Sequence, residues 1–438
     1  MENTTSNPLR WLLSAVVCTA LVLAGCSSSS VKKQAWVTTW ATAVQLVEPY
    51  NLPPAPGLEG NTLRQIVQVS IGGEAVQLRL SNEFGTADME IVNVELAEAL
   101  SAGDSPRQDE QSACRLTFSG SPDVVIRAGE RVTSDPIRFP LTPRQNVAIT
   151  IRFGRLSSAD VTGHPGSRTT SYILPPTETD WAKAVPTNHW YVINAIDVKP
   201  CAPSCAIAVL GNSITDGRGS TTNQQDRWTD NLSRRLLSDP LTSNIAVLNF
   251  GLGGNCVVRE GGLGPTAQTR YRRDLFGQQG VRYLVLFEGV NDLGSCDDGL
   301  GTADDVIRVF EQITNEAHAQ GIRVYGATVT PFKGHYYYSD DHEQGRQRLN
   351  AWLRTSPLLD GVIDFDRIMR SPSDTIRLNE RFLYEEDWLH PNAEGYHVMA
   401  NAIDIQRLFS RPIRRSEKNV EIIWNFLHET LSLQGERH

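Results

Sequence analysis

The chain lacks several patterns that mark common classes of protein. No apolar run of roughly 18 residues follows its N-terminal segment, so we expect the mature chain not to span a membrane. Basic residues are not in excess, because 41 Lys and Arg stand against 50 Asp and Glu, which gives a formal charge of −9. This balance argues against a nucleic acid or an anionic membrane surface as the principal partner.

Cysteine is sparse, with seven residues in a chain of 438. No pair of cysteines has the Cys-x-x-Cys spacing of zinc sites, so we expect no structural metal and no cofactor. When Cys18 and Cys26 in the N-terminal segment are set aside, an odd number remains, which leaves at least one free thiol. The remaining cysteines are Cys114, Cys201, Cys205, Cys256 and Cys296.

Two glycine motifs of common α/β folds are also missing. Thr215 stands where the second glycine of G-x-S-x-G would follow Ser213, which excludes the α/β-hydrolase elbow. Gly251-Leu252-Gly253 and the three residues after it do not complete the dinucleotide-binding pattern G-x-G-x-x-G.

The N-terminal segment predicts export. Arg10 precedes an apolar run from Trp11 to Leu23, which has the length of a signal peptide. The run closes in the sequence LAGC at Cys26, which resembles the lipobox of bacterial lipoproteins. The resemblance implies a signal peptide over residues 1–25, a tether over 26–35, and a lipid anchor at Cys26 that holds an exported protein on the bacterial cell envelope. An ordinary cleaved signal with an incidental cysteine is the alternative.

Residues 36–198 have the pattern of an all-β domain. Thr62–Ser70 and Ala75–Ser81 flank Gly72-Gly73, which predicts a hairpin. Short apolar runs continue at regular spacing, and this regularity predicts a sandwich or jelly-roll-like fold. His164 could face a functional site, although a loop histidine is more often structural or solvated.

From residue 205 to 410 apolar runs alternate with helical patterns. This rhythm predicts a doubly wound, parallel five-stranded sheet of the flavodoxin-like kind, with helices on both faces. The predicted strands are Ile207–Leu210, Ile245–Phe250, Val281–Phe287, Ile322–Ala327 and Val362–Phe365. The predicted helices lie near Arg227–Leu237, Ala303–Ala319, Gly345–Leu353 and Ala393–Leu408. Apolar residues at helical spacing predict a further helix over 411–438 that packs on the body or on a partner.

Residues with polar side chains, or in one case a glycine with its backbone N–H, follow four of the predicted strands. Ser213 follows the first, Gly254 the second, Asn291 the third, and Asp387 and His390 the last. The carboxyl ends of parallel strands form the edge where such sheets bind ligands. A nucleophile, a base with its orienting carboxylate, and hydrogen-bond donors for an oxyanion are what acyl transfer requires.

These residues and their order resemble the SGNH, or GDSL, family of hydrolases over Ala206–Leu408. The resemblance implies that Ser213 is the nucleophile and that Asp387 and His390 complete a triad. It also implies an oxyanion hole made by Gly254, Asn291 and the Ser213 N–H. The segment GNSITDGRGSTT and the leading AWVTTWATA are similar to the acetyl-xylan-esterase-like subgroup.

The sequence departs from the family pattern at Asn212, where the family usually has aspartate. The departure leaves nucleophile, base and oxyanion donors intact, so we expect activity to survive. Asp216 could supply part of the missing polar role or could cap the helix that begins after Ser213.

We therefore expect a serine esterase that hydrolyses O-acetyl groups on carbohydrate, with a small-molecule or polysaccharide ester as substrate. A lipase or lysophospholipase acting on longer acyl esters is the alternative within enzymes, and an inactive carbohydrate-binding lipoprotein is the alternative outside them. A metal site at His335, Asp340, Asp341 and His342 is a rival chemistry, although histidines of such loops are more often solvated. The oligomeric state does not follow from the sequence.

Two cysteines lie close to the predicted oxyanion donors. Cys256 follows Gly254 and Cys296 follows Asn291, so loops that meet at one oxyanion hole would bring the two cysteines close together. Export would permit a disulfide between them. A Cys201–Cys205 bond is a second expectation, with Cys114 as a competitor, and free thiols are the alternative.

Overall fold

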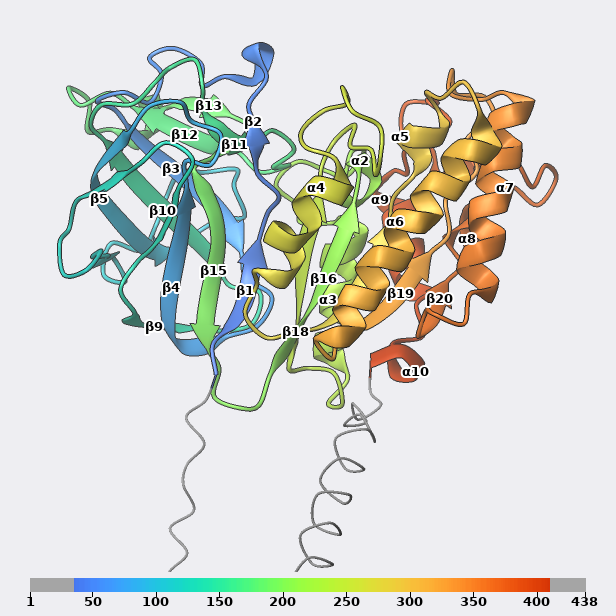
Figure 1. Ribbon diagram of the computed structural model, residues 1–438. Helices are drawn as coiled ribbons and strands as arrows, with labels where there is room; N and C mark the ends of the chain where they lie inside the picture. Colours follow the sequence, from blue (N-terminus) through green and yellow to red (C-terminus); the bar gives the residue numbers. More distant parts are fainter. Residues whose placement is uncertain (1–34, 410–438) are drawn as a thin grey trace, which may run out of the picture. The chain divides into compact units, whose positions relative to one another are not determined.

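The structure is a computed structural model that describes residues 35–409, in which antiparallel strands precede a parallel sheet with helices (Figure 1). The predicted signal peptide, nearly all of the tether, Cys26 and the predicted helix over 411–438 lie outside the described residues. Within residues 35–409 no helix is long and apolar enough to cross a membrane.

Three antiparallel sheets form the first half of the structure. The first contains β1 (Val37–Ala41), β15 (Ile193–Lys199), β4 (Gly73–Ser81) and β8 (Arg131–Thr133), with β9 (Ile137–Leu141) also paired to β4. The second contains β13 (Val185–Thr187), β12 (Ser171–Leu174), β3 (Thr62–Gln68), β10 (Asn146–Phe153), β5 (Met89–Glu98) and β6 (Cys114–Arg115), with β7 (Val124–Ile126) also paired to β5. The third contains β14 (Trp190–Tyr191), β11 (Thr162–His164) and β2 (Gln45–Leu46).

The predicted hairpin at Gly72-Gly73 is wrong, because β3 and β4 lie in different sheets. Neither glycine has the positive φ that a tight hairpin turn requires. A Cβ at Gly72 would lie 2.1 Å from the carbonyl oxygen of Leu141, and one at Gly73 would lie 2.7 Å from that of Lys199. The glycines therefore allow close backbone approach where the chain passes from one sheet to the other.

The second half confirms the predicted parallel five-stranded sheet. Its strand order is β17 (Ile245–Gly251), β16 (Cys205–Gly211), β18 (Val281–Phe287), β19 (Arg323–Ala327) and β20 (Gly361–Ile363). The helices are α2 (Ser213–Asp216), α3 (Trp228–Ser238), α4 (Ala267–Tyr271), α5 (Val290–Leu293), α6 (Gly299–Ala319), α7 (Asp340–Thr355), α8 (Phe365–Met369), α9 (Ala393–Asn401) and α10 (Ile405–Phe409). The helix predicted over Ala393–Leu408 is thus divided into α9 and α10.

Both faces of the parallel sheet are buried, which explains the continuous apolar runs of its strands. Ala208 and Leu210 of β16 belong to a core shared with α6, whereas Ile207 and Val209 belong to a second core with α3 and α9. The first of these cores continues into the antiparallel sheets, for example through Val198 of β15. The antiparallel strands and the parallel sheet are therefore packed as one body over the described residues.

Candidate active site

Ser213 stands at the carboxyl end of β16 as the first residue of α2. Asn212 caps this short helix, because its side-chain oxygen accepts a hydrogen bond from the N–H of Ile214 at 3.0 Å. Gly217 ends the helix with a φ of 100°, which favours glycine. The sharp strand-to-helix turn presents the Ser213 hydroxyl beyond the sheet edge.

A chain of hydrogen bonds joins Ser213 to two residues near the C-terminal end of the described region. Ser213 Oγ lies 2.8 Å from Nε2 of His390, and Nδ1 of His390 lies 2.6 Å from Oδ2 of Asp387. The other carboxylate oxygen of Asp387 accepts hydrogen bonds from the N–H groups of Leu389 and His390 at 2.9 and 2.8 Å. The imidazole is thus held in one orientation, with Nε2 toward the hydroxyl.

Burial and hydrogen bonding together set the charge states of His390 and Asp387. Desolvation lowers the pKa of His390 below 6.5, although the Asp387 carboxylate opposes the effect. For Asp387, burial acts to raise the pKa, but the hydrogen bonds from His390 and from backbone N–H groups outweigh it and lower the pKa. At neutral pH the imidazole is therefore a neutral base beside an ionised carboxylate.

Gly254 and Asn291 line the same cavity as Ser213, His390 and Asp387, and its volume is about 650 Å³. The Asn291 side chain is fixed at both ends. Its Nδ2 donates to the carbonyl oxygen of Asn255 at 2.7 Å, and its Oδ1 accepts from the hydroxyl of Tyr337 at 3.1 Å. One N–H of the amide satisfies Asn255, which leaves the second for a ligand in the cavity. The structure therefore brings all five predicted site residues to one place.

A cluster of buried charged side chains next to Asn212 was not predicted from the sequence. Arg270 of α4 is fully buried and forms ion pairs with Asp274 and Glu288 at 3.0 and 3.4 Å. Glu288 also accepts a hydrogen bond from Nδ2 of Asn212 at 3.0 Å. Desolvation raises the pKa of Glu288 to about 8, even though Arg270 opposes the shift. Asn212 thus links the strand end before Ser213 to the strand end before Asn291.

Asp292 fixes the loop that follows Gly254. Its carboxylate accepts hydrogen bonds from the N–H groups of Val257, Val258 and Arg259 at 2.8 to 3.3 Å. Asp292 is fully buried, and desolvation raises its pKa although these hydrogen bonds act against the shift. The residue beside Asn291 therefore positions the loop that carries Gly254.

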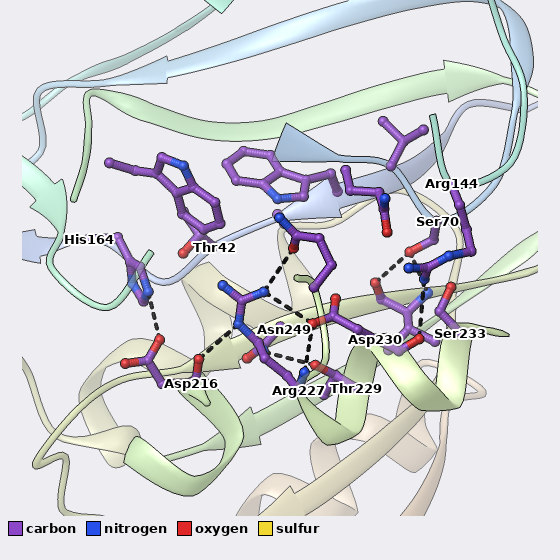
Figure 2. A pocket seen from close by; sticks show the side chains of 17 residues that line it. Thr42, Ser70, Arg144, His164, Asp216, Arg227, Thr229, Asp230, Ser233 and Asn249 are labelled. Carbon is purple, nitrogen blue, oxygen red and sulfur yellow. Dashed lines mark hydrogen bonds and ion pairs between the residues drawn. The ribbon is translucent and has the colours of Figure 1, made fainter. Parts of the chain in front are cut away.

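Asp216 does not cap α2; it binds to the antiparallel half of the structure. Its Oδ1 lies 2.9 Å from Nε2 of His164, whose Nδ1 lies 2.8 Å from the carbonyl oxygen of Ala43. Its Oδ2 lies 3.6 Å from the guanidinium of Arg168. His164 is thus a buried structural residue rather than a loop histidine at the site, and Figure 2 shows it directed at Asp216.

A second cavity, of only about 40 Å³, lies beside this contact (Figure 2). Arg227 crosses it, with Nε donating to the carbonyl oxygen of Asp216 at 3.0 Å and Nη1 to the carboxylate of Asp230 at 3.1 Å. The space is large enough for water only, so it is no candidate for a substrate site.

The rival metal site does not form. Both ring nitrogens of His342 contact backbone carbonyl oxygens, those of Tyr337 and Cys296, and His335 instead lines the 650 Å³ cavity. Over residues 35–409 no group of three or more His, Cys, Asp and Glu side chains is arranged to hold a metal ion.

The predicted disulfides are also wrong, because Cys114, Cys201, Cys205, Cys256 and Cys296 are all free thiols. The Cys296 thiol turns back to donate to the carbonyl oxygen of Leu293 at 3.3 Å. The Cys256 sulfur lies beside Gly262 instead, where a Cβ would be 3.5 Å from it. Cys256 is buried, which raises the pKa of its thiol beyond the usual range. The loops after Gly254 and Asn291 therefore do not form the Cys256–Cys296 disulfide, because each sulfur lies against residues of its own loop.

Comparisons with known proteins match a part of the chain. Solved structures similar to it include a member of the lipolytic G-D-S-L family from Veillonella parvula, with 18% identity, a TM-score of 0.36, and coverage of 48% of this chain and 100% of that one. An acetyl xylan esterase has 18% identity, a TM-score of 0.34, and coverage of 45% and 96%. A carbohydrate acetylesterase family member from Sinorhizobium meliloti has 15% identity, a TM-score of 0.36, and coverage of 47% and 99%. No curated protein matches the chain.

The family model of the GDSL-like lipase/acylhydrolases matches residues 209–398. This range begins within β16 and includes Ser213, Gly254, Asn291, Asp387 and His390. The parallel half of the chain is therefore a GDSL-like lipase/acylhydrolase domain, and the protein is a carboxylic ester hydrolase.

Proposed function

We propose that the protein is a serine esterase that removes short acyl groups, O-acetyl groups above all, from carbohydrate. The observation that carries the proposal is the hydrogen-bonded chain from Ser213 through His390 to Asp387, which opens into a cavity beside Gly254 and Asn291. Nucleophile, neutral base, orienting carboxylate and amide donors are the groups that ester hydrolysis through an acyl-enzyme needs.

The proposed reaction has two steps. In the first, Ser213 Oγ attacks the ester carbonyl carbon while His390 accepts the hydroxyl proton, and the C–O bond to the alcohol breaks as His390 returns that proton to the leaving oxygen. In the second, His390 takes a proton from water and the resulting hydroxide adds to the acyl carbon. The bond from that carbon to Ser213 Oγ then breaks as His390 returns the proton to Oγ, which releases the acid. The N–H groups of Ser213 and Gly254 and the amide of Asn291 stabilise the oxyanion in both steps.

The lining of the cavity favours a short acyl group. Among residues 35–409, only Leu263 and Leu389 contribute aliphatic side chains to it, and the other lining residues are glycines, aromatic residues and polar or charged groups. A long acyl chain would need a continuous apolar surface to compensate its transfer from a lipid phase. A long-chain lipase or lysophospholipase remains the competing function that the substrate test separates.

The test compares Ser213→Ala with the unaltered chain on p-nitrophenyl acetate and p-nitrophenyl dodecanoate. We expect kcat for the acetate to fall by about 10³-fold or more in Ser213→Ala. Ser238→Ala, at an exposed serine of α3, is the matched control and should keep full activity. In the unaltered chain kcat/KM should favour acetate over dodecanoate by about 10²-fold. Near-normal turnover by a folded Ser213→Ala protein would refute the serine mechanism, and a preference for dodecanoate would indicate a lipase.

We also propose that the chain is exported and anchored by lipid at Cys26, which rests on the sequence pattern alone. Cells that express the full chain with radiolabelled fatty acid should give a labelled protein in the membrane fraction. Cys26→Ala should remove the label, and a labelled Cys26→Ala protein would exclude this anchor.

A further inference from the structure

Two arginines, Arg168 and Arg218, line the cavity that holds Ser213 and His390. Arg218 is exposed and follows Gly217, the C-cap of α2, and within residues 35–409 its guanidinium has no hydrogen-bond or ion-pair partner. Arg168 comes from the loop after β11, in the antiparallel half, and its side chain is 31% exposed. Two distant segments of the chain therefore place positive charge at the same cavity.

Arg168 is held in place rather than free to swing into solvent. Its guanidinium lies 3.6 Å from Oδ2 of Asp216, while its buried Nε has no partner among the described residues. Its φ of 51° lies in the left-handed region, which is unfavourable for arginine and is tolerated where the surrounding structure fixes the residue. The carbonyl oxygen of Arg168 accepts a hydrogen bond from the N–H of Asn223 at 2.9 Å.

The acidic groups at the cavity do not neutralise both arginines. Asp387 is bound to His390, and Asp216 is shared between Arg168 and His164. Glu386 lines the cavity as an exposed residue, and no ion pair joins it to an arginine in the described part of the chain. An anionic group of a ligand would therefore meet an unpaired guanidinium at Arg218 and a partly paired one at Arg168.

Both arginines lie close to His390, whose cavity they line. Both act as charge neighbours of His390, and Arg218 is also a charge neighbour of His335. Since His390 returns its proton to the leaving oxygen, the alcohol part of the ester must lie close to His390, in the cavity that the arginines also line. Tyr336, which is 84% exposed, lines the same cavity, and its ring packs on that of His335 with the centroids 4.2 Å apart.

We propose that the alcohol part of the substrate carries a carboxylate, as in an acylated uronic-acid sugar, and that Arg168 and Arg218 bind this carboxylate. A planar guanidinium pairs with a carboxylate through two parallel hydrogen bonds, which gives orientation as well as affinity. The inference rests on the proposed esterase function and names the class of ester that the site prefers.

The test uses two esters that differ only in charge, monoacetylated methyl glucuronoside and monoacetylated methyl glucoside with the acetyl group at the same position. We expect the full chain to hydrolyse the glucuronoside with a kcat/KM about 10-fold higher at low ionic strength. Arg218→Gln should remove most of this preference, because kcat/KM should fall several-fold more for the glucuronoside than for the glucoside. Arg218→Lys should keep part of the preference, because it keeps the charge and loses the planar fork.

Arg168→Gln should lower the preference in the same direction as Arg218→Gln. The matched control is Arg259→Gln, an exposed arginine beside the loop of Gly254 that does not line the cavity, and it should leave the preference unchanged. Equal kcat/KM for the two sugars, or an equal loss on both sugars in Arg218→Gln, would overturn the inference. Hydrolysis of p-nitrophenyl acetate that depends on Ser213 would show that the esterase function stands even then, whereas no hydrolysis of any ester would refute the function itself.

Discussion

Asn212 donates from Nδ2 to Oε2 of Glu288 over 3.0 Å, while its own oxygen caps α2 at Ile214. An aspartate at this position has no hydrogen to donate, so two carboxylate oxygens would face each other at that distance unless one carboxyl kept a proton. Desolvation raises the pKa of Glu288 to about 8, which already favours its protonated form near neutral pH. The asparagine therefore suits a buried glutamate on the neighbouring strand end.

We expect Asn212→Asp to destabilise the protein more at high pH than at low pH. Because the pKa of Glu288 is raised in the folded protein above its ordinary value of 4.5, its contribution to stability is full below about pH 4.5 and is lost as the pH rises toward 8. The carboxyl that Asn212→Asp places beside Glu288 makes the loss of stability with rising pH larger. Calorimetry should give a loss that is about 1–3 kcal/mol larger near pH 8 than near pH 5. Glu288→Gln in the same chain should remove the difference, and an equal loss at both pH values would contradict the pairing.

The lowered pKa of His390 predicts where activity is lost on the acid side of the pH–activity profile. Burial lowers its pKa below 6.5, and Arg218 and Arg168 act in the same direction. Since the base must be neutral to accept the Ser213 proton, kcat/KM should rise through an apparent pKa below 6.5 and reach its plateau by neutral pH. Rates for p-nitrophenyl acetate measured between about pH 4 and pH 8 give this value. A limb centred above 6.5 would show that Asp387 outweighs burial in setting the pKa.

Asn291→Ala should lower kcat by about 10²–10³-fold with little change in KM, because an oxyanion donor acts mainly in the transition state. Its amide is already oriented by Asn255 and Tyr337, so the loss reflects a preorganised donor. Asn401→Ala, at an exposed position of α9, serves as the control. A change confined to KM would make Asn291 a ground-state binding residue.

At the scale of the elements, α4 supplies the residue that ties two strand ends together. Arg270 donates to the carbonyl oxygens of Phe250 and Gly211 at 3.0 and 3.1 Å. These two residues lie at the carboxyl ends of β17 and β16. It also carries the ion pairs to Asp274 and Glu288. The Arg270 side chain thus holds together the strand ends that form the edge of the sheet at Ser213.

We expect Arg270→Met to lower the free energy of unfolding by about 3–5 kcal/mol, because it takes from buried Glu288 its cation and leaves two buried carbonyl oxygens without their donor. Asp274 keeps an ion pair with Arg273. Urea unfolding measures the loss. The control is Arg272→Met, whose side chain is 58% exposed in its ion pair with Glu316 and should cost less than about 1 kcal/mol. Losses of equal size in the two variants would show that burial of Arg270 contributes nothing.

The elements also show how far the sequence could predict this structure. The parallel strands were predicted because burial on both faces leaves continuous apolar runs, and their common carboxyl edge follows from their order. The pairing of β3 and β4 was mispredicted, since alternation reports which face of a strand is buried and not which strand is its neighbour. The group formed by Asn212, Arg270 and Glu288 gives no local pattern, because its members meet only in the folded chain. The catalytic roles of the five site residues stay predictions.

At the scale of the molecule, the antiparallel strands and the parallel sheet share buried contacts as well as a core. Arg79 of β4 pairs with Asp197 at 3.0 Å and donates to Gln278 at 2.6 Å, and Gln278 lies just before β18. Ser70 exchanges hydrogen bonds with the backbone of Val247 in β17, with its hydroxyl donating at 2.8 Å and accepting at 3.1 Å. Separation of the two halves would expose these polar groups together with the apolar residues between them.

We therefore expect residues 35–409 to unfold in a single cooperative transition, with no state in which one half is folded alone. The emission of tryptophans in both halves, such as Trp40 and Trp228, reports on the whole body, whereas ester hydrolysis reports on the parallel half only. Urea curves followed by fluorescence, circular dichroism and residual activity should coincide within error. Arg79→Met should shift all three curves to lower urea together, because it leaves Asp197 buried without its cation. Activity that survives the first of two fluorescence transitions would show instead that the parallel half is stable without the antiparallel strands.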